Sequence, residues 1–188
     1  KDIQKKRDLI DYIKILKKLK NDDIILISDY EKGAANCCRE IIKYCNQNNI
    51  YTIIDPKNSN WFKYFGAKTI KCNKKEYLDH RRNDDLSLEI NSKSINESRK
   101  KYNLDNLIVT LGSDGMIIVD AFGNSKKYCS KDIHVYDVSG AGDAVASGVA
   151  YLIANKFSIL NNGDFLCELG ALIIQQIGTS PVPKDFSY

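Results

Sequence analysis

Residues 137–143 read Asp-Val-Ser-Gly-Ala-Gly-Asp, and an apolar segment from Ala144 to Ala154 follows them directly. This order predicts a loop of small residues that opens a helix, beginning near Gly140 and ending near Ala154. Small side chains allow a loop backbone to come close to a ligand. The first amides of a helix have no intrahelical partners and point outward with the positive end of the helix dipole. The segment therefore predicts an anion-binding site at a helix start.

Asp143 gives this segment a chemical role. It falls in the first turn of the predicted helix, beside the expected anion. A carboxylate that only filled space there would repel a phosphate, whereas one that accepts a proton from an incoming hydroxyl acts as a general base. A short glycine loop before an acidic helix start also occurs as a purely structural feature. The rest of the chain has to decide between these two interpretations.

Continuous apolar runs upstream of this loop predict β-strands. Apolar runs without polar alternation are typical of strands that are buried on both faces of a parallel sheet. Two further short segments flank Phe-Gly-Asn at positions 122–124, and this pattern predicts a hairpin. The predicted strands are residues 24–27, 50–54, 69–72 and 107–111, with the hairpin strands at residues 116–119 and 126–129.

Helical spacing of apolar residues predicts helices between and around these strands. Residues 80–99 are polar and charged and predict either a mobile loop or short helices. The alternation of strands and helices predicts an α/β fold with a largely parallel sheet. The predicted helices are residues 9–19, 37–45 and 164–177, the last one ending at Gly178.

Polar residues follow several of the predicted strands at the point where each strand ends. Open α/β sheets bind ligands at the carboxyl ends of their strands, so we expect these residues to lie near a ligand. They are Ser28-Asp29, Asp55-Pro56-Lys57, Asn73 and Thr110-Leu111-Gly112.

Composition excludes several classes of protein. The chain has 188 residues, of which 43% are hydrophobic, and this is too apolar for a disordered chain. No stretch approaches the ~20 apolar residues of a membrane-spanning helix. The net charge of +4 is too small to indicate nucleic-acid binding. Six cysteines without a C-x-x-C pair, most of them in apolar runs, favour reduced thiols in a cytoplasmic protein.

Further segments make the sequence resemble the ribokinase (PfkB) family of carbohydrate kinases. The resemblance is strongest to the heptose 7-phosphate kinases, including the kinase domain of the bifunctional heptose kinase/adenylyltransferases. It implies a three-layer α/β/α fold with a mostly parallel central sheet. The segments are residues 26–33 (Leu-Ile-Ser-Asp-Tyr-Glu-Lys-Gly), 54–57 (Ile-Asp-Pro-Lys), 73–76 (Asn-Lys-Lys-Glu), 109–116 (Val-Thr-Leu-Gly-Ser-Asp-Gly-Met) and 135–143.

The resemblance implies a role for each residue of the helix-start segment. Asp143 would be the base that deprotonates the sugar hydroxyl attacking the γ-phosphate of ATP. The backbone amides of Gly140, Ala141 and Gly142 would form the anion hole. This agrees with the interpretation drawn from the residues alone.

Nucleotide and metal contacts are implied in the same way. Thr110, Gly112 and Gly115 would line the ATP phosphates, although Gly112 to Gly115 alone predicts only a turn. Asn73 would contact the nucleotide, and Asn73 and Glu76 would order Mg²⁺ largely through water. Taken alone, this pair is a helix-capping pattern. Cys167 stands where relatives often carry an asparagine near the nucleotide. Whether a monovalent cation is also bound stays open.

Residues after two strand ends are candidates for substrate binding. Lys32 and Lys57 could each contact a phosphate or be solvated surface lysines, and Asp29 belongs to the same strand-end set. Tyr30 and Trp61 are expected to pack rather than to contact substrate.

The expected function is ATP-dependent phosphorylation of the anomeric hydroxyl of D-glycero-D-manno-heptose 7-phosphate, in ADP-heptose and lipopolysaccharide core synthesis. The alternatives are a kinase for another sugar or nucleoside, and a non-catalytic nucleotide-binding protein. The expected partners are ATP and a sugar phosphate, without nucleic acid or membrane. Residues 1–188 would form the carboxyl-terminal, catalytic portion of one kinase domain. The resemblance also implies an amino-terminal part with a lid, absent from these residues, through which a homodimer could form.

Overall fold

The computed structural model of the chain describes residues 10–30, 34–57, 59–130 and 140–175, and six strands form its central sheet. The strands lie side by side in chain order, from β1 to β6. The first four are parallel, while β5 and β6 are antiparallel additions that form the predicted hairpin. The strands are β1 (Ile24–Ser28), β2 (Tyr51–Asp55), β3 (Thr69–Asn73), β4 (Asn106–Thr110), β5 (Met116–Val119) and β6 (Ser125–Tyr128).

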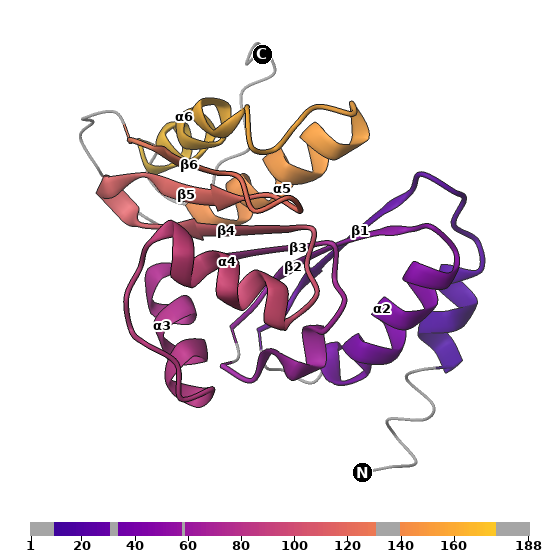
Figure 1. The fold of residues 1–188 in the computed structure, drawn as a ribbon. Helices are drawn as coiled ribbons and strands as arrows, with labels where there is room; N and C mark the ends of the chain where they lie inside the picture. Colours follow the sequence, from indigo (N-terminus) through magenta and orange to yellow (C-terminus); the bar gives the residue numbers. More distant parts are fainter. Residues whose placement is uncertain (1–9, 31–33, 58, 131–139, 176–188) are drawn as a thin grey trace.

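Helices cover both faces of this sheet (Figure 1). The three helices α2, α3 and α4 lie on one face, and α5 and α6 lie on the other, so that the three-layer α/β/α prediction is confirmed. Residues 10–16 are also helical. The helices are α2 (Cys38–Gln47), α3 (Lys74–Asn83), α4 (Ser92–Lys101), α5 (Ala141–Ala154) and α6 (Gly163–Ile174), with short 3₁₀ turns η1 (Ala34–Cys37), η2 (Trp61–Tyr64) and η3 (Gly112–Asp114).

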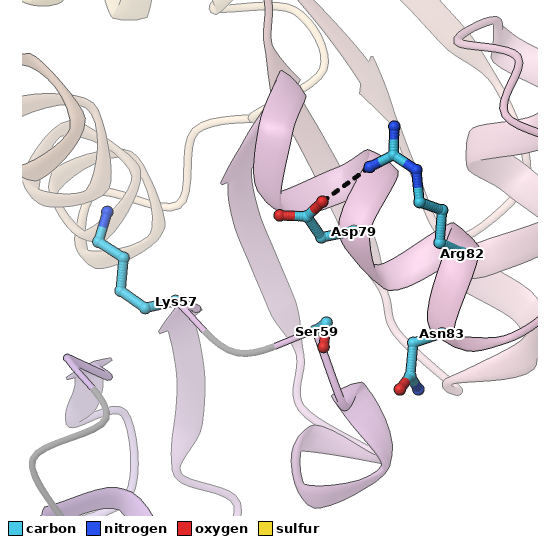
Figure 2. A pocket seen from close by; sticks show the side chains of 5 residues that line it. All are labelled: Lys57, Ser59, Asp79, Arg82 and Asn83. Atoms are coloured by element: carbon cyan, nitrogen blue, oxygen red, sulfur yellow. Dashed lines mark hydrogen bonds and ion pairs between the residues drawn. The ribbon is translucent and has the colours of Figure 1, made fainter.

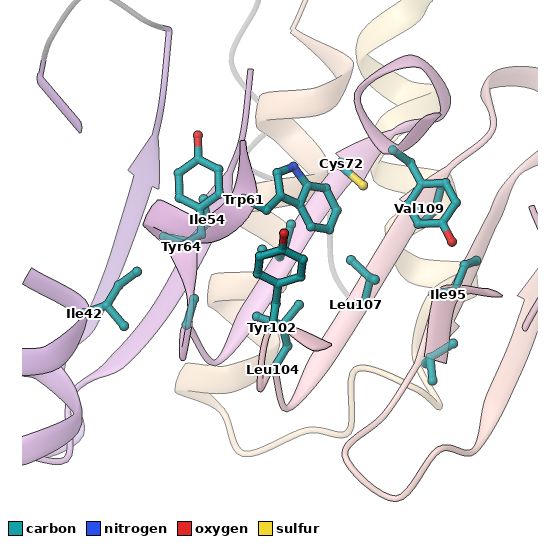
Figure 3. Packing of buried hydrophobic residues seen from close by; sticks show 14 of the residues in the cluster. Ile42, Ile54, Trp61, Tyr64, Cys72, Ile95, Tyr102, Leu104, Leu107 and Val109 are labelled. Carbon is teal, nitrogen blue, oxygen red and sulfur yellow. The ribbon is translucent and has the colours of Figure 1, made fainter. Parts of the chain in front are cut away.

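Successive residues of the central strands point to opposite faces, and this alternation divides the core in two. Ile54, Ile70 and Leu107 pack toward α2, α3 and α4 with the aromatic rings of Trp61 and Tyr102 (Figure 3). Ile53, Ile108 and Ile118 pack toward α5 and α6 with Val149 and Leu166. Apolar residues therefore serve both faces, as the continuous runs in the sequence predict.

β1 departs from the predicted burial on both faces. Leu26 is 38% exposed, and the other residues of the strand are half-buried or exposed. Within the described residues β1 lies at the edge of the sheet, with β2 as its neighbour. An apolar run identifies a strand but does not tell a central strand from an edge strand, and this is why the prediction was wrong here.

The polar stretch at residues 80–99 contains the end of α3 and most of α4, so the alternative of short helices is confirmed. Asn91 begins α4 through a capping box with Ser94, in which each side chain accepts a hydrogen bond from the other residue's backbone amide. The last predicted helix ends at Ile174 in α6, and Gly178 lies outside the described residues. None of the helices in the described ranges is long and apolar enough to cross a membrane.

Candidate functional site

The predicted anion site lies at the start of α5. Gly140 caps the helix with a φ of +84°, a left-handed conformation that favours glycine, and the amide of Ala144 donates to its carbonyl at 2.9 Å. Gly140 brings no side chain to the first amides of the helix. Residues 131–139, which include the first part of the loop motif, lie outside the described residues. The helix start itself is as the sequence predicts.

Lys71 was not among the predicted site residues, and the structure brings it to this helix start. It belongs to β3, where Ile70 and Cys72 point toward α3 and α4, so Lys71 points to the opposite face, toward α5. A Cβ atom added to Gly142 would lie 3.0 Å from the Lys71 ammonium nitrogen. The sequence does carry a signal for this residue, namely a lysine inside an otherwise buried strand, two positions before Asn73.

Asp55, at the end of β2, is the ion-pair partner of Lys71. The Lys71 ammonium donates to Oδ1 of Asp55 at 2.8 Å, and each side chain is 3% exposed. Burial raises the pKa of the Asp55 carboxyl, and the neighbouring Lys71 ammonium opposes this change. A buried charge needs a partner of this kind, because taking an unpaired ion out of water costs several kcal/mol.

The charges at this end of the sheet favour an anion. A cation at a helix N-terminus is electrostatically unfavourable, because the helix dipole already places positive charge there. The Lys71 ammonium nevertheless lies beside Gly142 in the first turn of α5. Asp55 pairs with the ammonium, and the Asp143 carboxylate in the same turn also faces the positive end of the helix. The first amides of α5 and the Lys71 ammonium are the groups that a phosphate could contact here.

Asp143 lies in the first turn of α5 and faces Tyr30, which follows β1. The Tyr30 hydroxyl donates to both carboxylate oxygens of Asp143, at 3.2 Å to Oδ1 and 3.3 Å to Oδ2. Tyr30 is 52% exposed, so the expectation that it packs in the core was wrong, while the expectation that it does not contact substrate stays a prediction. Trp61 is fully buried, and for this residue the packing prediction is confirmed.

Asn73 and Glu76 form the capping box that begins α3. The Asn73 side chain accepts from the Glu76 amide at 2.9 Å, and Glu76 Oε2 accepts from the Asn73 amide at 2.8 Å. The other Glu76 oxygen accepts from Lys57 at 2.8 Å, and this hydrogen bond raises the pKa of Lys57. The capping interpretation is confirmed, while the roles of the pair toward nucleotide and metal stay predictions.

The donor set around Glu76 bears on how Mg²⁺ would be held. Both Glu76 oxygens already accept hydrogen bonds from protein groups, and the residue is 7% exposed. Among the described residues no three His, Cys, Asp or Glu side chains are grouped as a metal site. Mg²⁺ usually keeps several waters and is held largely by nucleotide phosphates. The residues fit an ion that reaches Glu76 through water rather than one held in a protein cage.

The predicted phosphate-lining residues lie at the end of β4. Thr110 pairs with Asn73 across β3 and β4, so these two candidates lie at the same edge of the sheet. Gly112 begins η3 and Gly115 directly follows it, with φ of +66° and +82°. A Cβ atom on Gly115 would lie 1.9 Å from the Tyr128 carbonyl oxygen, so this glycine is required by the close approach of β6.

The remaining predicted site residues are Cys167, Asp29 and Lys32. Cys167 is buried in the apolar cluster between α5 and α6, and burial raises the pKa of its thiol to about 11. Asp29 is 2% exposed; its carboxylate pairs with Lys63 and accepts from Tyr64 at 2.6 Å, which ties η2 to the end of β1. Lys32 lies outside the described residues. The ligand contacts assigned to all three stay predictions.

A pocket of about 510 Å³ lies beside the capping box, and Lys57 lines it. Figure 2 shows Lys57 on one side, at the end of β2, with Asp79, Arg82 and Asn83 of α3 on the other side and Ser59 between them. Asp79 and Arg82 pair with each other at 2.8 Å. Lys57 is 41% exposed, so the predicted substrate-binding lysine borders open space.

Comparisons with known proteins point in the same direction as the site. The model of the pfkB family carbohydrate kinase matches residues 4–185. The bifunctional protein HldE of Campylobacter jejuni (strain RM1221) is 33% identical over 171 residues, covering 89% of this chain and 36% of the relative. HldE of Sulfurimonas denitrificans is 30% identical over 170 residues, with 89% and 35% covered. The chain thus spans about a third of the length of these curated relatives.

Solved structures share the fold at lower sequence identity. Phosphofructokinase-2 from Escherichia coli, in complex with potassium, aligns with a TM-score of 0.74 and 18% identity, over 88% of this chain and 55% of that one. Ribokinase from Thermotoga maritima aligns with a TM-score of 0.65 and 20% identity, over 84% and 52%. These likenesses identify the fold as ribokinase-like.

Proposed function

Since this chain belongs to the pfkB family of carbohydrate kinases, we propose that it carries the catalytic part of an enzyme that transfers the γ-phosphoryl group of ATP to a sugar hydroxyl. The observation that carries the proposal is that Lys71 and Asp143 both lie at the start of α5, and that Lys71 is ion-paired with Asp55 there. The first turn of α5 therefore has a positive charge beside it that could bind a phosphate. The same turn carries a carboxylate that could accept the proton of a hydroxyl.

The proposed chemistry divides between backbone and side chains. Asp143 accepts the proton of the sugar hydroxyl as its oxygen attacks phosphorus. The amides at Gly140, Ala141 and Gly142, together with the Lys71 ammonium, stabilise the negative charge on the transferred group. Phosphoryl transfer needs little covalent help from the protein, so positioning and charge stabilisation supply most of the rate enhancement.

Nucleotide and metal would occupy the neighbouring strand ends. In this proposal Thr110 and Gly112, at the end of β4, line the phosphates of ATP, and Asn73 and Glu76, at the start of α3, hold the hydration shell of Mg²⁺. When bound, the ion supplies charge neutralisation between the phosphates. Because phosphofructokinase-2 from Escherichia coli is described in complex with potassium, the assay should also vary the monovalent cation.

For the acceptor we propose D-glycero-D-manno-heptose 7-phosphate, with its anomeric hydroxyl phosphorylated to give the 1,7-bisphosphate. Residues 26–33 and 135–143 resemble the heptose kinases, and the relatives named HldE support assignment to this subfamily. Such a reaction belongs to ADP-heptose synthesis for the lipopolysaccharide core and to the cytoplasm, where ATP is supplied. The buried thiols of Cys38, Cys45 and Cys72 form no disulfide within the described part of the chain, which agrees with a reducing compartment.

A transfer assay with labelled ATP tests both parts of the proposal. The full-length protein is incubated with Mg²⁺ and, in parallel, with heptose 7-phosphate, fructose 6-phosphate, ribose and a nucleoside. We expect label to appear in the heptose bisphosphate. Transfer to another acceptor alone would contradict the heptose assignment, and no transfer to any sugar would contradict the kinase assignment.

A further inference from the structure

Tyr30 joins two segments that lie far apart in the chain. It follows β1, whereas Asp143 lies 113 positions later in the first turn of α5, and the phenol hydroxyl donates to both oxygens of that carboxylate. The two distances differ by only 0.1 Å, from 3.2 to 3.3 Å. The hydroxyl therefore faces the middle of the carboxylate.

The ring of Tyr30 is held by a second charged group. The ammonium of Lys57, which follows β2, lies 5.8 Å from the ring centroid, within the range of a cation–π contact. Lys57 is in turn fixed by its ion pair with Glu76 in the first turn of α3. The phenol thus stands between the ends of β1 and β2 on one side and the start of α5 on the other. An aromatic residue that is 52% exposed gains little from burial, so this placement is not explained by packing.

We propose that Tyr30 is a positioning residue, whose hydroxyl holds the Asp143 carboxylate in the orientation from which it takes the proton of the acceptor hydroxyl. This inference rests on the proposed function. A hydrogen bond between a hydroxyl and a carboxylate is usually about 2.5–2.7 Å long, so the bond from Tyr30 is a weak one. A carboxylate has about four acceptor positions. Asp143 can therefore keep the Tyr30 contact and accept a second, shorter bond from a substrate.

Three elements bring side chains to the start of α5, where Asp143 lies. β3 presents the Lys71 ammonium to Gly142, the residue before Asp143. α6 presents the apolar side chain of Ile173 to Gly140. The end of β1 brings the phenol hydroxyl directly to the carboxylate. Removal of that hydroxyl frees the carboxylate to rotate without changing the shape of the ring that Lys57 contacts.

The first test does not depend on activity. The full-length protein is prepared with carbon-13 in its aspartate carboxyl groups, and the Asp143 resonance is assigned by its loss in Asp143→Asn. We expect this resonance to shift in Tyr30→Phe and to stay in place in Tyr151→Phe, which removes a phenol hydroxyl from the exposed face of α5. An unchanged resonance in Tyr30→Phe would overturn the inference, whether or not the protein is a kinase.

The second test follows the rate. Tyr30→Phe is expected to lower kcat about three- to tenfold, the equivalent of one net hydrogen bond, with little change in KM for ATP. In an Asp143→Asn background the same substitution should have no further effect, because its target is already gone. An equal loss in both backgrounds would show that Tyr30 acts by another route and would overturn the inference. If the wild-type protein transfers no phosphate, the proposed function is wrong. The carbon-13 resonance of Asp143 then shows by itself whether Tyr30 orients the carboxylate.

Discussion

Individual residues at the start of α5 carry most of the proposed chemistry. Asp143 and the glycines of residues 140–142 could be predicted from the sequence, because small residues before an apolar helix and an acid in its first turn have a direct physical meaning. Lys71 and Tyr30 could not be predicted as site residues from the sequence. Their importance depends on which face of β3 meets α5, and on how closely the end of β1 approaches the same helix.

Replacing the proposed base tests the chemistry directly. Asp143→Asn keeps the size of the side chain and removes its ability to take a proton, so turnover should fall at least about 100-fold, the lower range for a general base. The measurement is kcat for phosphate transfer in the full-length protein. Asp164→Asn, in the first turn of α6, is a matched control and should keep its turnover. Unchanged turnover in Asp143→Asn would remove this residue from the mechanism.

Neutralising the buried ion pair tests the positive charge beside α5. The double variant Lys71→Met/Asp55→Asn removes both charges together and so avoids an unpaired buried carboxylate, which would cost about 3–5 kcal/mol of stability. We expect the variant to fold and its turnover to fall about 100-fold, as for loss of one preorganised donor.

The control for this pair is the exposed ion pair between Lys68 and Asp105, at 3.2 Å. Lys68→Met/Asp105→Asn makes the same chemical change on the surface and should leave turnover within about twofold, because exposed pairs contribute ~0–1 kcal/mol. Circular dichroism of both variants establishes that they are folded. Equal turnover in the two double variants would contradict a role for Lys71 in charge stabilisation.

Secondary-structure elements were predicted best where an apolar run or a turn signal marked them in the sequence. The strands β2, β3 and β4, the hairpin and α5 all lie within one or two residues of their predicted bounds. The polar helices α3 and α4 were the weakest part, since few apolar residues mark their buried sides. For α3 the capping pattern of Asn73 and Glu76 was the better signal, because the side-chain spacing of a capping box does not depend on apolar content.

The two capping boxes allow a capping role to be separated from a ligand role. Asn91→Ala and Asn73→Ala should each lower the free energy of unfolding by about 1 kcal/mol, the usual effect of losing an N-cap side chain. Only Asn73→Ala should also lower turnover, because Asn73 lies at the proposed nucleotide edge whereas Asn91 begins α4. Urea unfolding and steady-state kinetics measure the two effects. Equal turnover in both variants would limit Asn73 to capping.

At the scale of the whole molecule, the largely parallel sheet was predicted from the alternation of strands and helices, and the three layers were implied by the resemblance to the ribokinase family. The sequence did not reveal which strand lies at the edge of the described sheet. It also did not indicate the polar network that joins α3 to the end of α4. That network contains His80, which is fully buried and stacks on Trp61, and Asp84, which accepts hydrogen bonds from Lys101 and Tyr102.

This network predicts a loss of stability in acid. Burial lowers the pKa of His80 to about 4, against an ordinary value of 6.5. Between these values the unfolded chain binds a proton that the folded chain does not, so stability is complete above pH 6.5 and falls as the pH approaches 4, by on the order of 3 kcal/mol. Burial alone would raise the pKa of Asp84, but hydrogen bonds from Lys101 and Tyr102 lower it below its usual value. Asp84 therefore adds a loss in the same direction.

Urea unfolding at a series of pH values checks this prediction. His80→Phe keeps a ring against Trp61 and removes the titrating group, so its stability should change less between pH 6.5 and 4 than that of the wild type. A parallel decline in both proteins would assign the acid sensitivity to other groups.

The stack of Trp61 on His80 also provides an optical probe of the interior. Trp61 is the chain's single tryptophan, and its ring lies parallel to the imidazole with the centroids 3.9 Å apart. An imidazolium quenches the emission of an indole that it touches, whereas a neutral imidazole does so much less. The emission of the native protein therefore dims as His80 gains its proton and shifts to longer wavelength only when Trp61 meets water. One spectrum can thus separate protonation inside the folded molecule from unfolding, without any label.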